Sequence, residues 1–141
     1  MSGYFATYPR VKEYMNEAIA AAKEKGYVQT LFGRRREVPE LTSSNPAQRG
    51  FGERVALNMP LQGTASDMIK LAMIKVFERL TKGGFESKLI MQVHDELIVD
   101  ALPEEAEKVA ALLKECMEGV IRLKVELKVS VGKGENWLEA K

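Results

Sequence analysis

The chain has 141 residues and a formal net charge of +1, with a hydrophobic fraction of 45% and a charged fraction of 29%. These values are typical of a soluble globular domain, or of a piece of a larger protein. No signal peptide is recognisable, and no uncharged apolar run approaches the roughly 20 residues that cross a bilayer, which argues against a membrane partner. The single Cys116 cannot form an internal disulfide and fits a reducing cytoplasm.

The charges are distributed unevenly along the chain. Residues 1–82 carry 13 Lys or Arg against 8 Asp or Glu, whereas residues 83–141 carry 8 against 12. A basic first part beside an acidic second part suggests that one part meets an anion and the other holds a cation. Plain solvation of both parts accounts for the same imbalance, so both interpretations stay open.

The first predicted elements are a helix and a small hairpin. Pro9 suits the first turn of a helix, and apolar residues then recur every three or four positions until Gly26, which predicts a helix over 9–25. Two short extended runs flank Gly33-Arg34 and predict a hairpin that ends at Pro39. The stretch "ELTSSN" that follows is expected to be a loop.

Two helical segments come next. Asn45-Pro46 has the pattern of a helix cap followed by proline at the first helical position. The helix is expected to run to Pro60, which should end or kink it. The small residues of "QGTAS" permit close backbone approach, and a second helical segment then continues to Gly83-Gly84.

The last part of the chain predicts a hairpin, a helix and a strand. In "KLIMQVHDELIVD" (88–100), a two-residue turn at His94-Asp95 would pair Val93 with Glu96, Gln92 with Leu97 and Met91 with Ile98. Both strands are apolar on both faces, so the hairpin should be central or sandwiched. A helix from Pro103 to Gly119 and a half-buried strand over "KVELKVSV" (124–131) follow. The order of elements predicts an α+β fold with an antiparallel sheet whose central hairpin is packed by helices.

The tip of this hairpin carries three ionisable side chains, His94, Asp95 and Glu96, where hairpin turns usually favour glycine. Carboxylates on a rigid mount suit Mg²⁺, which prefers hard oxygen ligands and keeps several waters. A polar turn that merely faces water is the alternative interpretation. The alternation of side chains along a strand points Glu96 away from Asp95, so the residues alone indicate half of a metal site.

A polar stripe on the preceding helix suggests a second type of contact. Arg54, Asn58 and Gln62 are spaced four residues apart and would line one helix face. Such donors, aimed at the minor groove, read base-pair geometry without reading sequence, because every pair presents acceptors there. A solvated helix face is the alternative, and the basic run "GRRR" (33–36) is either a phosphate contact or solvated surface.

Several stretches together resemble the DNA polymerase I family, also called family A. "QVHDEL" (92–97) is similar to the family's third polymerase motif, and "ERVALNMPLQGTASDMIKLAM" (53–73) is similar to the helix before it. "YFATYPRVKEYM" and "GYVQTLFGRRREVPEL" resemble its fingers segment, and "VGKGENW" resembles its C-terminal end. The motifs stand in the family's order and extend from about Tyr4 to Trp137.

The resemblance implies roles for individual residues. Asp95 matches the palm aspartate that helps to hold two Mg²⁺ ions, Glu96 matches the acidic residue with a lesser part, and His94 matches a residue near the primer terminus. The stripe matches residues that contact the minor groove of the primer–template: Arg54, Asn58 and Gln62. Residues 1–50 would then be a distal fingers segment and residues 51–141 a palm segment.

The chain also departs from the family's pattern. It has no "DYSQIELR"-like run, which carries the first-motif aspartate, and no nucleotide-binding helix. We therefore expect a C-terminal fragment that needs the remainder of the polymerase chain, binds deoxynucleoside triphosphates through the missing segment and is inactive alone. A non-catalytic nucleic-acid-binding module of the same fold is the main alternative, and a metal-dependent nuclease is a further one.

Overall fold

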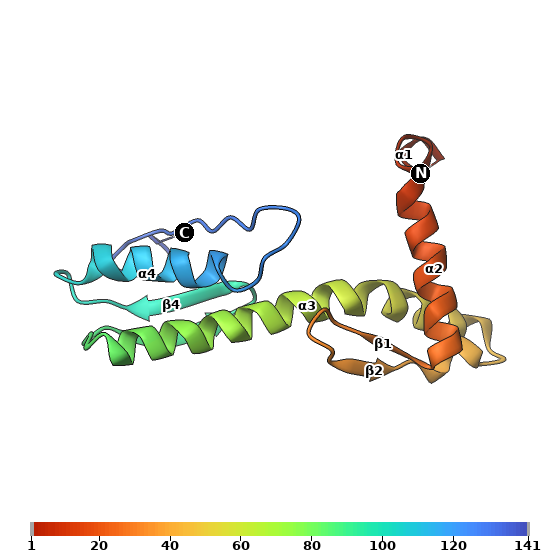
Figure 1. The fold of residues 1–141 in the computed structure, drawn as a ribbon, viewed down its shortest axis with the longest axis horizontal. Coiled ribbons are helices and arrows are strands. Elements are labelled where there is room, and N and C mark those ends of the chain that lie inside the picture. Colours follow the sequence, from red (N-terminus) through yellow and green to blue (C-terminus); the bar gives the residue numbers. More distant parts are fainter. Residues whose placement is uncertain (1, 141) are drawn as a thin grey trace. The chain divides into compact units, whose positions relative to one another are not determined.

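The structure is a computed structural model that describes residues 2–140. The chain forms two compact units, and the division between them falls after Ala65. Each unit combines helices with one two-stranded antiparallel sheet (Figure 1). The predicted α+β class is confirmed. No helix among residues 2–140 is both long and apolar enough to cross a membrane.

The first unit begins with elements that the sequence largely predicts. Its elements are α1 (Ser2–Thr7), α2 (Pro9–Lys25), β1 (Tyr27–Gln29), β2 (Arg35–Glu37) and the 3-10 helix η1 (Pro39–Thr42). The bounds of α2 are those predicted, and it ends because Gly26 adopts a left-handed conformation with φ 77°. The expected hairpin forms between β1 and β2. Helix α1 and η1 were not predicted.

Helix α3 (Pro46–Lys82) is the longest element and corrects one prediction. Its start is as expected, since the Asn45 side-chain oxygen accepts a hydrogen bond from the Ala47 N–H at 2.9 Å. Pro60 does not end the helix, because α3 continues through it to Lys82, so the expected second helical segment is part of α3. An internal proline costs about 3 kcal/mol through one lost N–H donor and a ring clash, but it does not prevent the turns on either side from forming.

The first unit packs its helices at close range around one apolar core. The core residues come from α2, β1, η1, the loop before η1 and the start of α3: Ala22, Val28, Val38, Leu41, Val55 and Ala56. Gly52 lies where α3 crosses η1, and a Cβ atom added to it would stand 2.9 Å from the Leu41 backbone nitrogen. Only glycine therefore fits this crossing without displacing the backbone.

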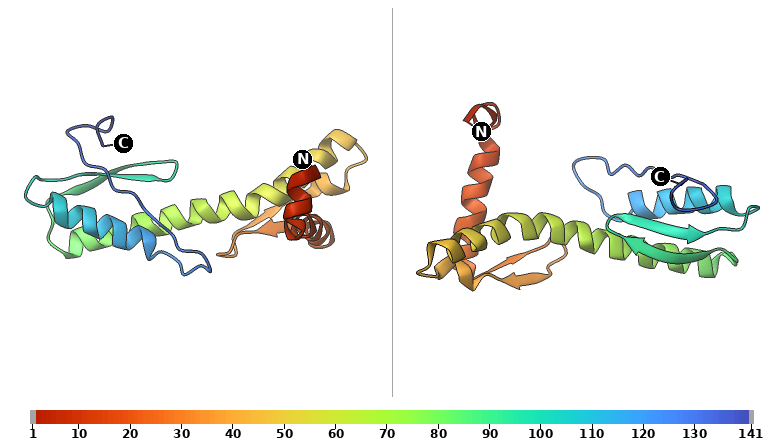
Figure 2. Two further views of the ribbon diagram at one scale, coloured as in Figure 1. Left: turned by 90° about the horizontal axis from the view of Figure 1, so that it is seen from above. Right: turned by 180° about the vertical axis from the view of Figure 1, so that it is seen from behind.

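The second unit contains the C-terminal part of α3, the hairpin of β3 (Lys88–Val93) and β4 (Glu96–Asp100), and α4 (Ala106–Glu118). The register near the turn is the predicted one, with Val93 opposite Glu96, and an irregularity at Ile90 shifts the pairing nearer the base. Figure 2 shows the hairpin and α4 side by side. Their shared core contains Leu89, Leu97 and Val99 from the hairpin and Val76, Leu80, Val109, Leu112 and Cys116 from the helices.

The hairpin is packed on one face only, which corrects the expectation of a central or sandwiched hairpin. Within residues 2–140 its sheet has two strands, and Ile90 and Met91 are 59% and 42% exposed. A strand that is apolar on both faces is expected to pack against a partner on each face. Among the described residues the helices cover one face, whereas Ile90 and Met91 remain exposed.

A carboxylate fastens the base of the hairpin to the start of α4. The Glu105 carboxylate accepts hydrogen bonds from the backbone N–H groups of Glu86 and Ser87, at 3.2 and 2.9 Å, and from the Ser87 hydroxyl at 2.5 Å. The Ser87 oxygen in turn accepts the Leu102 N–H at 3.1 Å. Helix α4 accordingly begins at Ala106 rather than at the predicted Pro103.

The predicted strand over 124–131 does not form in the described chain, where these residues are irregular. Its alternating side chains favour a strand, but a strand requires backbone partners on a neighbouring strand. The contact made by the Val129 N–H is instead with the Glu118 carboxylate, at 3.0 Å. Leu127 and Val129 are half-buried, whereas Val125 is 71% exposed, so burial follows the alternating pattern only in part.

We predict opposite effects for two glycine substitutions in α3. Gly52→Ala should destabilise the protein by about 1–3 kcal/mol, because the new methyl group meets the η1 backbone. Gly50→Ala should stabilise it by about 0.5–1 kcal/mol, since the nearest atom lies 3.9 Å from the added Cβ and alanine favours helix. Urea unfolding of both variants measures the contrast, and equal effects would contradict the close crossing.

A second prediction concerns pH. The hydrogen bonds from Ser87 hold the pKa of Glu105 below its usual value. A carboxylate with a lowered folded pKa stabilises the protein fully above its unfolded pKa of about 4.3, and this stabilisation is lost as the pH falls through the folded value. Glu105→Gln should therefore lower the melting temperature at pH 7 and change it less at pH 3. Glu104→Gln, at an exposed neighbour, is the control and should show no such pH dependence.

Candidate nucleic-acid and metal site

The tip of the β3–β4 hairpin is a two-residue turn without glycine. His94 has φ 52°, and it is the one non-glycine residue with positive φ among residues 2–140. The left-handed region is unfavourable for a side chain with a Cβ atom, so the turn stores strain. The Gln92 side-chain amide donates to the His94 carbonyl at 2.7 Å and supports this conformation.

The two carboxylates beside the turn have different surroundings. Asp95 is exposed at the tip. Glu96 begins β4 and is half-buried, and its Oε2 accepts the indole N–H of Trp137 at 3.1 Å. The sequence indicated only that Trp137 packs, so its contact with a predicted site residue is a new observation.

The donor set at the tip fits part of a magnesium site. Carboxylate oxygens are the ligands that Mg²⁺ prefers, and it usually takes one or two of them together with water and substrate phosphate. No three His, Cys, Asp or Glu side chains gather into a metal-binding group in the described part of the chain. Asp100 lies at the other end of β4, opposite Lys88, and Asp67 lies on α3. Asp95 and Glu96 would therefore supply part of a ligand shell.

The predicted stripe lies on one continuous helix. Arg54, Asn58 and Gln62 are all exposed on α3, and the helix continues past Pro60, so all three follow one helical path. Each step of four residues turns the helix by about 400°, which displaces successive side chains by only about 40°. Val55 and Ala56 face the core instead. The stripe is in the first unit and the hairpin tip is in the second.

The basic loop between β1 and β2 is attached to α3 close to the last stripe residue. The Leu31 N–H donates to the Thr64 hydroxyl at 3.0 Å, and the Arg34 guanidinium donates to the Gly63 carbonyl at 2.9 Å. Arg35 stacks 4.6 Å above the Tyr27 ring centroid. Arg34 therefore holds the loop to α3 and Arg35 stacks across the hairpin, while all three arginines of "GRRR" are exposed.

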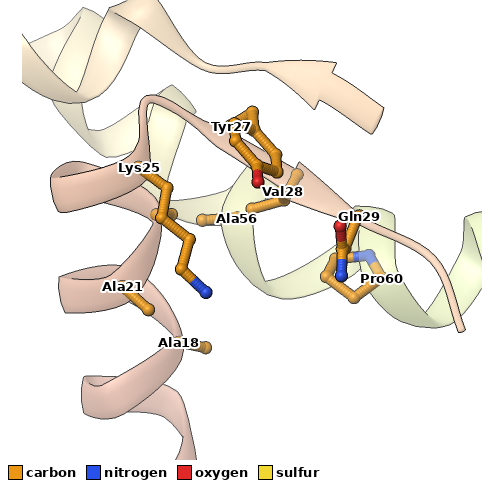
Figure 3. Close-up of a pocket in the computed structure, with 9 residues that line it drawn as sticks. Ala18, Ala21, Lys25, Tyr27, Val28, Gln29, Ala56 and Pro60 are labelled. Carbon is orange, nitrogen blue, oxygen red and sulfur yellow. The ribbon is translucent and has the colours of Figure 1, made fainter. Parts of the chain in front are cut away.

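A hollow of about 140 Å³ lies between α2, β1 and α3 in the first unit. Figure 3 shows Lys25, Tyr27 and Gln29 around it, with Pro60 on the α3 side. The rest of its lining is small and apolar. It contains no paired carboxylates and no activated nucleophile, so we do not assign chemistry to it.

Comparison with known proteins identifies the family to which the chain belongs. The family model described as DNA polymerase family A matches residues 1–139. The chain belongs to DNA polymerase family A. This membership covers both the helix with the polar stripe and the hairpin with the charged tip.

Two relatives show how far the similarity extends. The chain is 50% identical over 138 residues to the thermostable DNA polymerase I of Thermus thermophilus and to the DNA polymerase I of Deinococcus radiodurans. The alignments cover 98% of this chain but only 16% and 14% of those proteins. The chain therefore spans about a sixth of the length of the family A relatives that it matches.

A solved structure has the same fold. It is described as the POL domain of Pol1 from M. smegmatis in complex with DNA primer-template and dNTP. Its TM-score with this chain is 0.94 at 42% sequence identity, and the match covers 97% of this chain and 24% of the solved chain. The α+β architecture is thus that of part of a family A polymerase domain.

The strain at the hairpin tip leads to a prediction. His94→Gly should be more stable than His94→Ala by about 1 kcal/mol, because glycine adopts positive φ without steric cost. At Lys88, which pairs with Asp100 in β3, the order of stability should reverse, with the alanine variant more stable than the glycine variant by about 0.5–1 kcal/mol. Chemical unfolding of the four variants tests the assignment. The same order of stability at both positions would contradict a left-handed His94.

Proposed function

We propose that this chain is the C-terminal part of a template-directed DNA polymerase and carries one of its metal-binding carboxylates. The observation that carries the proposal is the exposed Asp95 at the rigid tip of β3–β4, in a member of family A. A solved relative of the same fold was captured with primer-template DNA and dNTP. These partners are the ones we propose for the complete protein.

The proposed reaction is nucleotidyl transfer. The primer 3′-hydroxyl attacks the α-phosphate of a deoxynucleoside triphosphate, and pyrophosphate leaves. Bound Mg²⁺ would supply Lewis acidity here, by lowering the pKa of the attacking hydroxyl and neutralising charge on the leaving group. Asp95 would offer an oxygen ligand from the hairpin tip, Glu96 would have a lesser part, and His94, in the same turn, would lie near the primer terminus.

The stripe on α3 would check the paired end of the primer–template. Arg54, Asn58 and Gln62 carry donors on exposed side chains along one helical path. In the minor groove, purine N3 and pyrimidine O2 accept hydrogen bonds at nearly the same positions in every Watson–Crick pair. Donors aimed there stabilise correct pairs of any sequence and lose contacts at a mispair.

We assign residues 1–50 to a distal fingers segment and residues 51–141 to a palm segment. Deoxynucleoside triphosphates would bind mainly through segments that lie outside this sequence, in the remainder of the polymerase chain. The cytoplasm, where chromosomal DNA and nucleotides are available to a bacterial polymerase, is the proposed place of action.

The chain by itself should not synthesise DNA. Two-metal catalysis requires at least two carboxylates that share both ions, and the family's first-motif aspartate is missing from this sequence. A primer-extension assay with the chain alone and Mg²⁺ should show no product, and templated synthesis by the chain alone would refute this proposal. Salt-dependent DNA binding without any metal dependence would favour a non-catalytic binding module instead.

The catalytic assignment is tested in the complete polymerase that contains this C-terminal sequence. Asp95→Asn should lower primer extension more than about 100-fold, which exceeds the usual effect of losing an outer-shell partner of a metal ligand. Asp100→Asn, which removes the same charge at the far end of β4, is the matched control and should retain activity. Equal loss in both variants would contradict a special role for the tip.

The groove assignment is tested with Arg54→Ala in the same enzyme. A lost bidentate contact of about 1–3 kcal/mol should lower kcat/KM on matched primers roughly 5- to 150-fold. The loss should be smaller on primers that end in a mispair, where the contact is already weakened. Lys82→Ala, at the exposed end of α3, controls for loss of positive charge. Equal extension rates for Arg54→Ala and the unmodified enzyme would remove the assignment.

A further inference from the structure

The C-terminal segment reaches the hairpin tip through Trp137. The indole N–H donates to Glu96 Oε2 at 3.1 Å, across 41 positions of sequence and within one structural unit. An indole N–H is a donor only, so this contact requires an acceptor, and a carboxylate is a strong one. Trp137 is the single tryptophan of the chain.

The turn that carries Trp137 is held by its own hydrogen bonds. The Glu139 carboxylate accepts the Asn136 side-chain amide at 2.7 Å and the Glu135 N–H at 3.2 Å. The Asn136 carbonyl accepts the N–H groups of Glu139 and Ala140, each at 3.2 Å. A Cβ atom at Gly134 would stand 2.6 Å from the Glu139 Cβ, so the glycine lets the turn close. The indole is thus mounted on a defined turn.

The segment before this turn is attached to α4. The Val129 N–H donates to Glu118, and Lys133 forms an ion pair with Glu107. Helix α4 packs through Leu112 and neighbouring residues against the hairpin face that carries Leu89, Leu97 and Val99. The hairpin, α4 and the C-terminal turn are therefore connected to one another. The Trp137–Glu96 hydrogen bond joins the C-terminal turn to the first residue of β4, next to the hairpin tip.

We propose that Trp137 is a positioning residue that separates the two carboxylates of the tip. Its N–H holds Glu96 beside the C-terminal turn, and Asp95 is left as the carboxylate that meets the metal ion. This inference rests on the proposed metal role of the hairpin and adds to it a residue from the end of the chain. It also gives a physical reason for the lesser part of Glu96, because one of its oxygens is already engaged.

The contact is tested first without metal, in the 141-residue chain. A single tryptophan gives a single indole N–H cross-peak in a proton–nitrogen correlation spectrum. Glu96→Gln should shift this peak clearly, because the proton loses its charged acceptor, whereas Asp100→Asn should leave it in place. Far-UV circular dichroism confirms that both variants fold. An unmoved peak in Glu96→Gln, or an equal shift in Asp100→Asn, would overturn the proposal.

The division of roles is tested next with Mn²⁺ as the probe. Mn²⁺ at the tip should broaden the indole peak, and Asp95→Asn should abolish the broadening. Measured by the electron paramagnetic resonance signal of free Mn²⁺, Glu96→Gln should change the Mn²⁺ affinity more in a Trp137→Phe background than in the native chain, with a coupling of at least about twofold. Additive effects of the two substitutions would overturn the positioning role. Absence of Mn²⁺ broadening in the native chain, with the contact intact, would contradict the metal role of Asp95 and leave the Trp137–Glu96 assignment standing.

Discussion

The second unit depends on one apolar core, which fixes the register of the β3–β4 hairpin and with it the turn at its tip. A two-residue turn at His94-Asp95 joins β3 to β4, and it sets Val93 opposite Glu96. Because side chains alternate along a strand, a slip of one residue would move Leu97 and Val99 out of the core shared with α4. The apolar face therefore enforces the register, and the register holds His94 at φ 52° in spite of its strain. Burial of one face of the two strands thus places the charged residues at the tip.

Features with a local cause could be predicted from the sequence. Helix α2 begins at Pro9 and ends before Gly26 because proline suits a first turn and glycine adopts the left-handed cap. The pairing of Met91 with Ile98 followed from the alternation and the length of the turn. The exposed stripe of Arg54, Asn58 and Gln62 followed from helical spacing, although the continuity of α3 through Pro60 did not.

Features that depend on distant partners could not be predicted in this way. The alternation of 124–131 predicts a strand, but a strand forms only where another strand offers its backbone, and the described residues do not provide one. The open face of β3–β4 has the same cause. The Trp137–Glu96 hydrogen bond joins residues 41 positions apart, and a pattern of neighbouring residues does not predict a contact over that distance in sequence. A tryptophan near the end of a chain indicates packing, whereas its acceptor is revealed only by the fold.

The proposed function would account for the uneven distribution of charge along the chain. A basic first part suits a phosphate backbone, since each neutralised phosphate releases a counterion and strengthens binding. An acidic second part would repel the same backbone unless its carboxylates were engaged or bound to cations. In the structure Glu96, Glu105 and Glu115 are held by hydrogen bonds from Trp137, Ser87 and Arg79 respectively. Asp95 is exposed at the tip, where under the proposed function a metal ion would compensate its charge.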